Sequence, residues 1–119
     1  MVNLDTHVLV HALTGDLSPH EEHVLRREPW GVSAIVLWEL AKLVQLGRLT
    51  LDLDSAAFRR ALAALHIWPL DLDVARQSTR LDFKSDPADE WIAATSIVHA
   101  VPLLTRDERI RRSALVPLA

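Results

Sequence analysis

The sequence predicts a single α/β domain built on a parallel β-sheet. Four short apolar runs alternate with longer segments of helical period, and the connections between them are short. This alternation is typical of right-handed β–α–β crossovers. A chain of 119 residues has the size of one domain. Because 50% of the residues are hydrophobic and 24% are charged, the chain is able to bury a core.

The first strand is predicted at Met1–Leu4, where an apolar run stops at Asp5. Thr6 is expected to cap a helix over His7–Leu13, because its hydroxyl is able to accept a hydrogen bond from the first helical turn. Gly15 follows at the position where a glycine commonly ends a helix.

The second helix begins at the capping box Ser18–Glu21, which has Pro at its first helical position, and runs to about Arg27. A second strand is predicted at Trp30–Ser33. Ser33 also caps a long apolar helix over Ala34–Leu46, which the following Gly47 closes.

The middle of the chain predicts one more helix–strand–helix unit. Ser55–His66 is rich in Ala and Leu with helical period. Ile67–Leu70 reads as a third short strand. Asp71 is a suitable cap for a helix over Leu72–Leu81.

The last part of the chain contains the fourth strand. Asp86 and the proline after it open a helix that runs to about residue 100. Val101–Thr105 is the predicted strand, and Arg106–Arg112 is a short basic helix. Leu115–Leu118 is expected to add a last edge strand.

Composition excludes several classes of site. The chain has 0 Cys, which removes disulfides, thiolate zinc sites and cysteine nucleophiles, and its 3 Gly form no phosphate-binding motif.

No apolar run approaches the ~20 residues of a membrane helix. The acidic start lacks the features of a secretory signal, so we expect a cytoplasmic protein. The net charge of −3 favours neither nucleic acid nor membrane as a partner.

Acidic residues fall near the carboxyl ends of the predicted strands, where ligands bind in parallel α/β sheets. Asp5 directly follows the first strand, and Asp107 follows the fourth by two residues. Asp86 and Asp89 lie in the first turn of the helix that leads into the fourth strand. Glu39 is the only carboxylate of the long apolar helix, which we expect to be largely buried.

Carboxylates gathered at this edge would repel one another, by roughly 3 kcal/mol for each pair about 5 Å apart. Such a cluster needs protons or a cation, and its oxygen donors suit Mg²⁺ or Mn²⁺, which assist phosphodiester hydrolysis. The acids also have structural interpretations. Asp89 suits a helix N-terminus, and Asp107 fits inside a capping box over Thr105–Glu108. Glu39 is able to pair with Lys42 on a solvated strip. Both interpretations stay open.

Five motifs in order along the chain resemble PIN-domain proteins, in particular the VapC-like ribonuclease toxins of type II toxin–antitoxin pairs. The motifs are Asp5–Val10, Ser33–Leu40, Leu46–Leu49, Asp86–Thr95 and Pro102–Asp107. Each motif alone is weak. Together they have the family's order and spacing and cover almost the whole chain.

The resemblance implies a three-layer α/β/α fold and endonuclease cleavage of RNA with Mg²⁺ or Mn²⁺. The metal-binding and catalytic acids that it implies are Asp5, Glu39, Asp89 and Asp107. Thr105 matches a hydroxyl that orients the first acid, and Asp86 matches an accessory acid. Relatives often carry a basic residue after the third acid, where this chain has Glu90. The implied partners are an RNA substrate, a small cognate antitoxin and a second copy of the chain.

Basic and aromatic residues have less specific roles. Arg106 and Arg109 flank the fourth acid and are candidates to hold RNA phosphates, although such residues are equally typical of a solvated face. His7 and His11 have a spacing that can bind metal, but no third ligand of that type is nearby. The 4 Trp residues are expected mainly to pack against core elements.

Two other phosphate-handling classes fit poorly. A receiver-type domain needs adjacent acids after the first strand and a Lys after the last, where this chain has Asn3–Asp5 and Thr105–Arg106. A haloacid-dehalogenase-type phosphatase needs Asp-x-Asp, and the third position of that motif here is His7. The alternative to a nuclease is therefore a non-catalytic PIN-like module that binds RNA or protein.

Overall fold

The computed structural model describes residues 1–119 and contains four strands and seven helices. The strands are β1 (Val2–Leu4), β2 (Trp30–Ser33), β3 (His66–Trp68) and β4 (Leu103–Leu104). The helices are α1 (Thr6–Thr14), α2 (Pro19–Arg27), α3 (Ala34–Gln45), α4 (Ala56–Ala63), α5 (Leu72–Ser78), α6 (Pro87–His99) and α7 (Glu108–Arg111). None of these helices is both long enough and apolar enough to cross a membrane.

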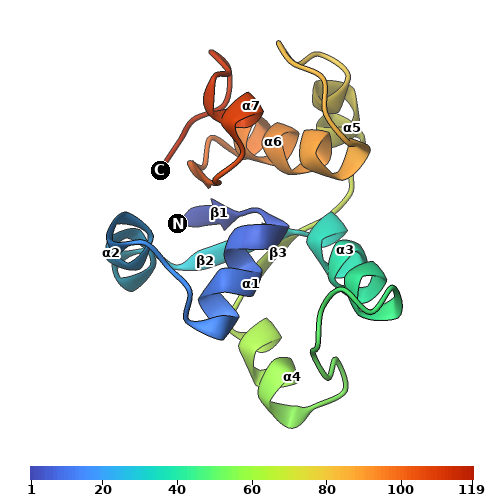
Figure 1. The fold of residues 1–119 in the computed structure, drawn as a ribbon. Helices are drawn as coiled ribbons and strands as arrows, with labels where there is room; N and C mark the ends of the chain where they lie inside the picture. The colour runs from blue at the N-terminus through green and yellow to red at the C-terminus, as the bar shows by residue number, and fades with distance from the viewer.

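The strands form one parallel sheet in the order β3-β2-β1-β4, and helices cover both of its faces. Figure 1 shows α5, α6 and α7 above the sheet and α1 and α4 below it, with α2 and α3 at opposite sides. The predicted α/β/α class is therefore confirmed. Because β1 lies between β2 and β4, its carboxyl end is at the centre of one edge of the sheet.

Helix caps explain where most helices begin. The side chains of Ser18, Ser33 and Asp71 accept hydrogen bonds from the first turns of α2, α3 and α5, as the sequence predicted. The predicted cap of α1 was wrong by one residue. Asp5 caps this helix and accepts from the Val8 N–H, because Thr6 already has helical geometry and uses its hydroxyl elsewhere.

Sheet pairing moved two strand boundaries. His66, predicted as the end of a helix, pairs with Gly31 at the start of β3, and the strand stops before Pro69. The predicted edge strand at Leu115–Leu118 is reduced to a parallel bridge between Leu103 and Leu118. At His66, hydrogen bonds to the neighbouring strand outweigh the local helix preference. At the C-terminal end, the N–H groups of Leu115 and Val116 bond to Ser113 Oγ, so these residues do not pair with the sheet.

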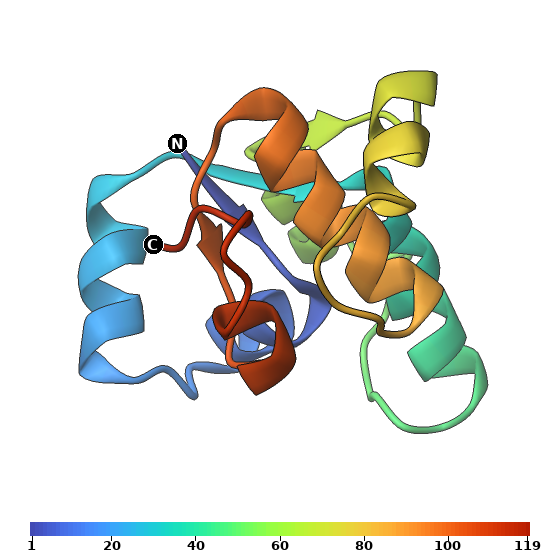
Figure 2. The same cartoon turned by 90° about the horizontal axis from the view of Figure 1, so that it is seen from above.

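The α3 helix is less buried than predicted. Val36 and Leu40 face the core, but Trp38 is 55% exposed and Leu46 is 62% exposed. The Lys42 ammonium lies over the Trp38 ring, 5.9 Å from its centroid. The expectation that this helix is largely buried, and that Trp38 packs in the core, was therefore wrong, because α3 lies at the side of the sheet and covers it with one face only (Figure 2).

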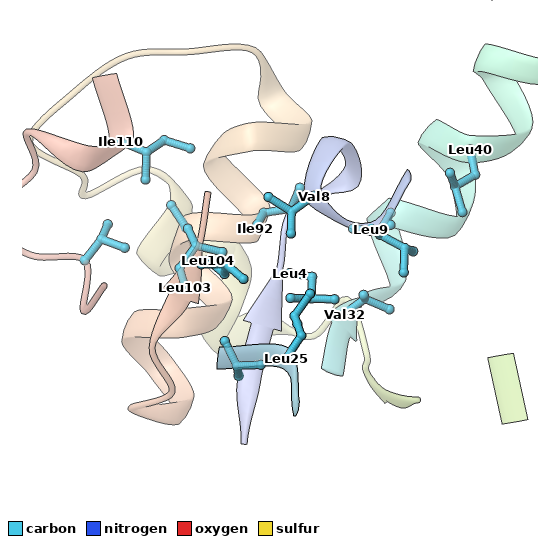
Figure 3. Packing of buried hydrophobic residues seen from close by; sticks show 14 of the residues in the cluster. Leu4, Val8, Leu9, Leu25, Val32, Leu40, Ile92, Leu103, Leu104 and Ile110 are labelled. Carbon is cyan, nitrogen blue, oxygen red and sulfur yellow. The ribbon is translucent and has the colours of Figure 1, made fainter. Parts of the chain in front are cut away.

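The core joins the sheet to both helix layers. Figure 3 shows Leu4 of β1 among side chains of α1, α6 and β4. In β1, the buried Asn3 side chain donates hydrogen bonds to the Ile92 carbonyl (3.2 Å) and to Ser96 Oγ (2.9 Å), which ties the central strand to α6. These contacts fix the position of β1, and hence of the residues that follow it.

Candidate functional site

A polar cavity lies beyond the carboxyl ends of β1 and β4. The two strands are parallel neighbours, so Asp5 after β1 and Asp107 after β4 meet at the same edge of the sheet. The cavity has a volume of about 220 Å³. Its lining residues are Asp5, His7, Asp89, Arg106 and Asp107. Three of the four acids singled out in the sequence therefore share one cavity.

Asp5 is buried at the floor of this site, with 6% of its surface exposed. Its Oδ1 accepts from the Val8 N–H at 2.8 Å, and its Oδ2 accepts from the Thr105 hydroxyl. Burial raises the pKa of Asp5 above its ordinary value of 3.8, although the two hydrogen bonds and the charge of His7 act against this shift. The Thr105 contact is the one that the resemblance implied.

Glu39 is held beside Asp5 by the residue that follows Asp5. The buried Thr6 hydroxyl donates a hydrogen bond to Glu39 Oε1, which joins α1 to α3. The alternative interpretation, a pair of Glu39 with Lys42, is not formed, since the Lys42 ammonium donates to Gln45. We predicted only a capping role for Thr6. The motif Asp5–Thr6 could have indicated this second contact, because a buried hydroxyl next to a buried acid needs a hydrogen-bond partner of its own.

Asp89 projects from the first turn of α6, where Ser85 Oγ donates to its Oδ2 at 3.1 Å. Burial raises the pKa of Asp89 above 3.8, and the nearby charges of Glu39, Asp107 and Asp86 raise it further. The charge of Asp89 is thus repelled by Glu39, Asp107 and Asp86, and that of Asp5 is repelled by Asp107. Asp86 itself is exposed and occupies the N-cap position of α6, but its side chain forms no capping hydrogen bond.

Asp107 caps α7, instead of lying inside its first turn as predicted. Its Oδ1 accepts from the N–H groups of Arg109 (2.8 Å) and Ile110 (3.2 Å). Its own N–H donates to Thr105 Oγ1 at 3.1 Å, so the same threonine contacts both Asp5 and Asp107. Thr105 and Asp107 therefore form one rigid turn after β4.

The two predicted RNA-binding arginines both contact protein atoms. Arg106 donates to both carboxylate oxygens of Glu21, at 2.7 and 2.8 Å, and to the Asp16 carbonyl at 2.8 Å. Arg109 donates to the Lys84 carbonyl at 2.9 Å.

The two histidines of α1 do not form a joint site. His11 Nδ1 lies 3.4 Å from Asp16 Oδ2, whereas the exposed His7 lines the cavity. The cavity therefore receives one imidazole in addition to its carboxylates.

The sequence profile of the PIN domain family matches residues 2–115. The chain belongs to the PIN domain family. No curated protein is significantly similar to it in sequence.

Several solved structures share the fold of this PIN domain. A toxin–antitoxin complex from Klebsiella pneumoniae is 20% identical, with a TM-score of 0.72 over 94% of this chain and 91% of that chain. FitAcB from Neisseria gonorrhoeae is 22% identical, with a TM-score of 0.70 over 99% and 96%. VapBC2 from Rickettsia felis, bound to a DNA fragment from its promoter, is 18% identical, with a TM-score of 0.71 over 100% and 98%. At these identities the likeness concerns the fold.

The donor set of this PIN domain fits a hard divalent cation in kind. None of Asp5, Glu39, Asp89 and Asp107 forms a salt bridge with a basic side chain, so no direct ion pair neutralises these acids. The side chains do not converge into a group of three or more ligands. Mg²⁺ requires only one or two carboxylates and keeps several waters, so this open arrangement suits it better than a closed protein cage would.

Proposed function

We propose that this PIN domain is a metal-dependent endoribonuclease that acts as the toxin of a toxin–antitoxin pair. One observation supports this most directly. Acidic side chains separated by up to about a hundred positions gather around one polar cavity, and two of them, the buried Asp5 and the partly buried Asp89, have a raised pKa. Helix capping alone does not require these acids to lie near one another, whereas binding a cation does.

The four acids share one role in this proposal. The catalytic and metal-binding residues are Asp5, Glu39, Asp89 and Asp107. Bound Mg²⁺ or Mn²⁺ would supply the Lewis acidity that phosphodiester hydrolysis requires. Thr105 holds the orientation of Asp5 through its hydroxyl, and the exposed Asp86 adds negative charge near Asp89.

The hydroxyl contacts explain how flexible carboxylates would be kept ready for a cation. Thr105, Thr6 and Ser85 each donate to a different acid: Asp5, Glu39 and Asp89 respectively. A carboxylate that is already oriented loses less side-chain entropy on binding. The protein thus supplies orientation, and repulsion among the acids supplies the affinity for positive charge.

The RNA substrate is consistent with the charge distribution. The chain has 16 acidic and 13 basic residues, so neutralising the four site acids leaves 12 against 13. The remaining surface would then be close to neutral and would not repel a polyanion. The positively charged residues Arg106 and Arg109 are adjacent to the site. A phosphate contact by Arg109 stays a prediction, whereas the guanidinium of Arg106 already binds the Glu21 carboxylate.

An antitoxin is the proposed protein partner. A second cavity of about 380 Å³ lies between α1, the start of β2 and α4, and eight of its nine lining residues are hydrophobic. The similar structure from Klebsiella pneumoniae is a toxin–antitoxin complex. An apolar segment of a small antitoxin is a suitable occupant. We also propose a homodimer, and the exposed Trp38 on α3 and Leu46 directly after this helix are candidates for its interface.

The test of the nuclease is the variant Asp5→Asn. Asn caps helices as well as Asp does, so the variant keeps the fold of α1 while removing one charge from the site. We expect wild-type protein to cleave single-stranded RNA in Mg²⁺ but not in EDTA, and Asp5→Asn to lose more than about 100-fold of the rate. Asp54→Asn, an exposed loop acid, is the matched control.

Three outcomes are informative. Cleavage that survives both EDTA and Asp5→Asn would overturn the metal-dependent mechanism. Wild-type protein that binds RNA or a partner protein without cleaving RNA would favour the alternative, a non-catalytic binding module. Cleavage that depends on both the cation and Asp5 supports the nuclease.

A further inference from the structure

Arg106 lies between two residues of the candidate site. Thr105 before it contacts Asp5, and Asp107 after it caps α7. Arg106 extends from this turn to α2, which Figure 2 shows set apart at one side of the sheet. Its hydrogen bonds to Glu21 connect the turn after β4 to α2.

The contact with α2 is a two-point ion pair with a buried partner. Arg106 Nε lies 2.8 Å from Glu21 Oε2, and Arg106 Nη2 lies 2.7 Å from Glu21 Oε1. Only 7% of the Glu21 side chain is exposed. The same Nη2 also donates to the Asp16 carbonyl at 2.8 Å. Paired bonds of this kind fix direction as well as distance.

Glu21 is itself fixed within its helix. Its side chain accepts from the Ser18 N–H at 2.8 Å, which completes the capping box of α2. The hydrogen bonds from Arg106 lower the pKa of Glu21 to about 2, so the carboxylate stays ionised near neutral pH. The charge of Arg106 is thus balanced by Glu21, and its Nε and Nη2 donors are directed at protein atoms, although 42% of its side chain is exposed.

We propose that Arg106 is a positioning residue, which fixes the turn of Thr105 and Asp107 by binding Glu21 and the Asp16 carbonyl, and that it does not bind the RNA backbone. This inference rests on the proposed function of the site. It differs from the prediction that a basic residue beside an acidic site holds substrate phosphate. To contact a phosphate with the same edge, the guanidinium would have to leave a buried carboxylate without its partner.

The variant Glu21→Gln separates the two roles of Arg106. Gln fits a capping box as well as Glu does, so α2 keeps its start. The variant removes the carboxylate from the ion pair but leaves the arginine and its charge in place. If Arg106 only positions the turn, Glu21→Gln lowers the cleavage rate. If Arg106 binds RNA, the same variant releases the guanidinium from Glu21 and RNA binding becomes stronger.

Cleavage kinetics provide the first measurement. We expect Glu21→Gln and Arg106→Met each to lower kcat by about 10- to 100-fold, since small displacements of site groups have effects of this size. KM and the Kd for RNA, measured in the Asp5→Asn background, should change less than about twofold. The double variant should be no worse than the worse single variant. The control pair, Glu22→Gln and Arg26→Met, alters an exposed ion pair of 3.8 Å on the same helix and should leave kcat unchanged.

Amide hydrogen exchange provides a second measurement that needs no RNA and no catalysis. The N–H of Asp107 is bonded to Thr105 Oγ1, and the N–H of Ile110 is bonded to Asp107 Oδ1. Both should exchange at least about tenfold faster in Glu21→Gln, and in Arg106→Lys as a second variant, while the Glu21 N–H of the capping box stays protected.

The outcomes are distinct. A Kd for RNA that rises in Arg106→Met and falls in Glu21→Gln would overturn the proposal in favour of a phosphate contact. Unchanged exchange at Asp107 and Ile110 would also overturn it. A wild-type protein that cleaves no RNA would overturn the proposed function alone, and faster exchange in the two variants would still support the positioning role.

Discussion

The Thr6 hydroxyl donates a hydrogen bond to the carboxylate of Glu39, 33 positions further along the chain. Thr6 directly follows Asp5 and is buried. The bond therefore sets the position of one site acid relative to another and joins α1 to α3. A residue that locally resembles a helix cap instead orients a charged group on a different helix.

Replacing Thr6 by Val removes the hydroxyl and keeps the branched shape of the side chain. We expect the RNA cleavage rate to fall by about 10- to 100-fold, the usual effect of removing a residue that orients a metal ligand. Thr6→Ser should retain most of the rate. Thr14→Val, at the exposed end of the same helix, is the control. Equal initial rates for Thr6→Val and wild type in Mg²⁺ would contradict the orienting role.

Asp5→Asn and Asp89→Asn should stabilise the protein at pH 7 in EDTA. Both acids have a pKa raised by burial, so the folded state keeps these protons to higher pH than the unfolded state does. The contribution of each group to the free energy of unfolding therefore falls as the pH rises from 3.8 through the raised pKa. At neutral pH both acids are ionised and this loss of stability is complete. Urea unfolding at pH 7 should give higher midpoints for both variants. Lower midpoints would show that the ionised acids stabilise the fold.

A divalent cation should raise the melting temperature of wild-type protein. A ligand that binds only the folded state stabilises it by about 2.7 kcal/mol when its free concentration is ~100 times its Kd. We expect thermal scans in Mn²⁺ or Mg²⁺ to show this upward shift, and EDTA to reverse it. The shift should disappear in Asp5→Asn and persist in Asp73→Asn, an acid on the exposed side of α5. An equal shift in all three proteins would place cation binding elsewhere.

Glu21 should make the protein sensitive to acid. Its pKa is lowered from 4.5 to about 2 by the hydrogen bonds from Arg106, so the folded state releases this proton more readily than the unfolded state. The stabilisation is complete above pH 4.5 and is lost as the pH falls towards about 2. Unfolding free energies measured across this interval should decline less steeply in Glu21→Gln than in wild type or in Glu22→Gln. Parallel curves would mean that the ion pair adds nothing to stability.

Gly31 in β2 should not tolerate a side chain. A Cβ atom at this position would lie 2.5 Å from Cη2 and Cζ3 of the buried Trp68 ring. We expect Gly31→Ala to cost about 1–3 kcal/mol in urea unfolding, because the packed core has no room to relax. The cost should be smaller in a Trp68→Phe background, where those ring atoms are missing. The same cost in both backgrounds would indicate that backbone preference, and not the indole, excludes Ala.

The element pattern was largely predictable, because helix caps and apolar runs act over a few residues. The capping box of α2 and the caps at Ser33 and Asp71 are local hydrogen bonds, and each was found where it was predicted. The errors occur where distant segments compete. His66 belongs to a strand because it pairs in parallel with Gly31. The α3 helix is half exposed because only one of its faces packs against the core.

The sequence by itself determined the α/β class, the family resemblance and the acids most suited to a metal site, because these depend on residue type, order and spacing. The resemblance implied the contact of Asp5 with Thr105, but only the tertiary structure decided the partners of Glu39 and Arg106. Thr105 and Asp5 are 100 positions apart, and Arg106 and Glu21 are 85 positions apart. Contacts over such separations depend on the order of strands in the sheet and on the packing of α2, and no local pattern in a single sequence encodes either.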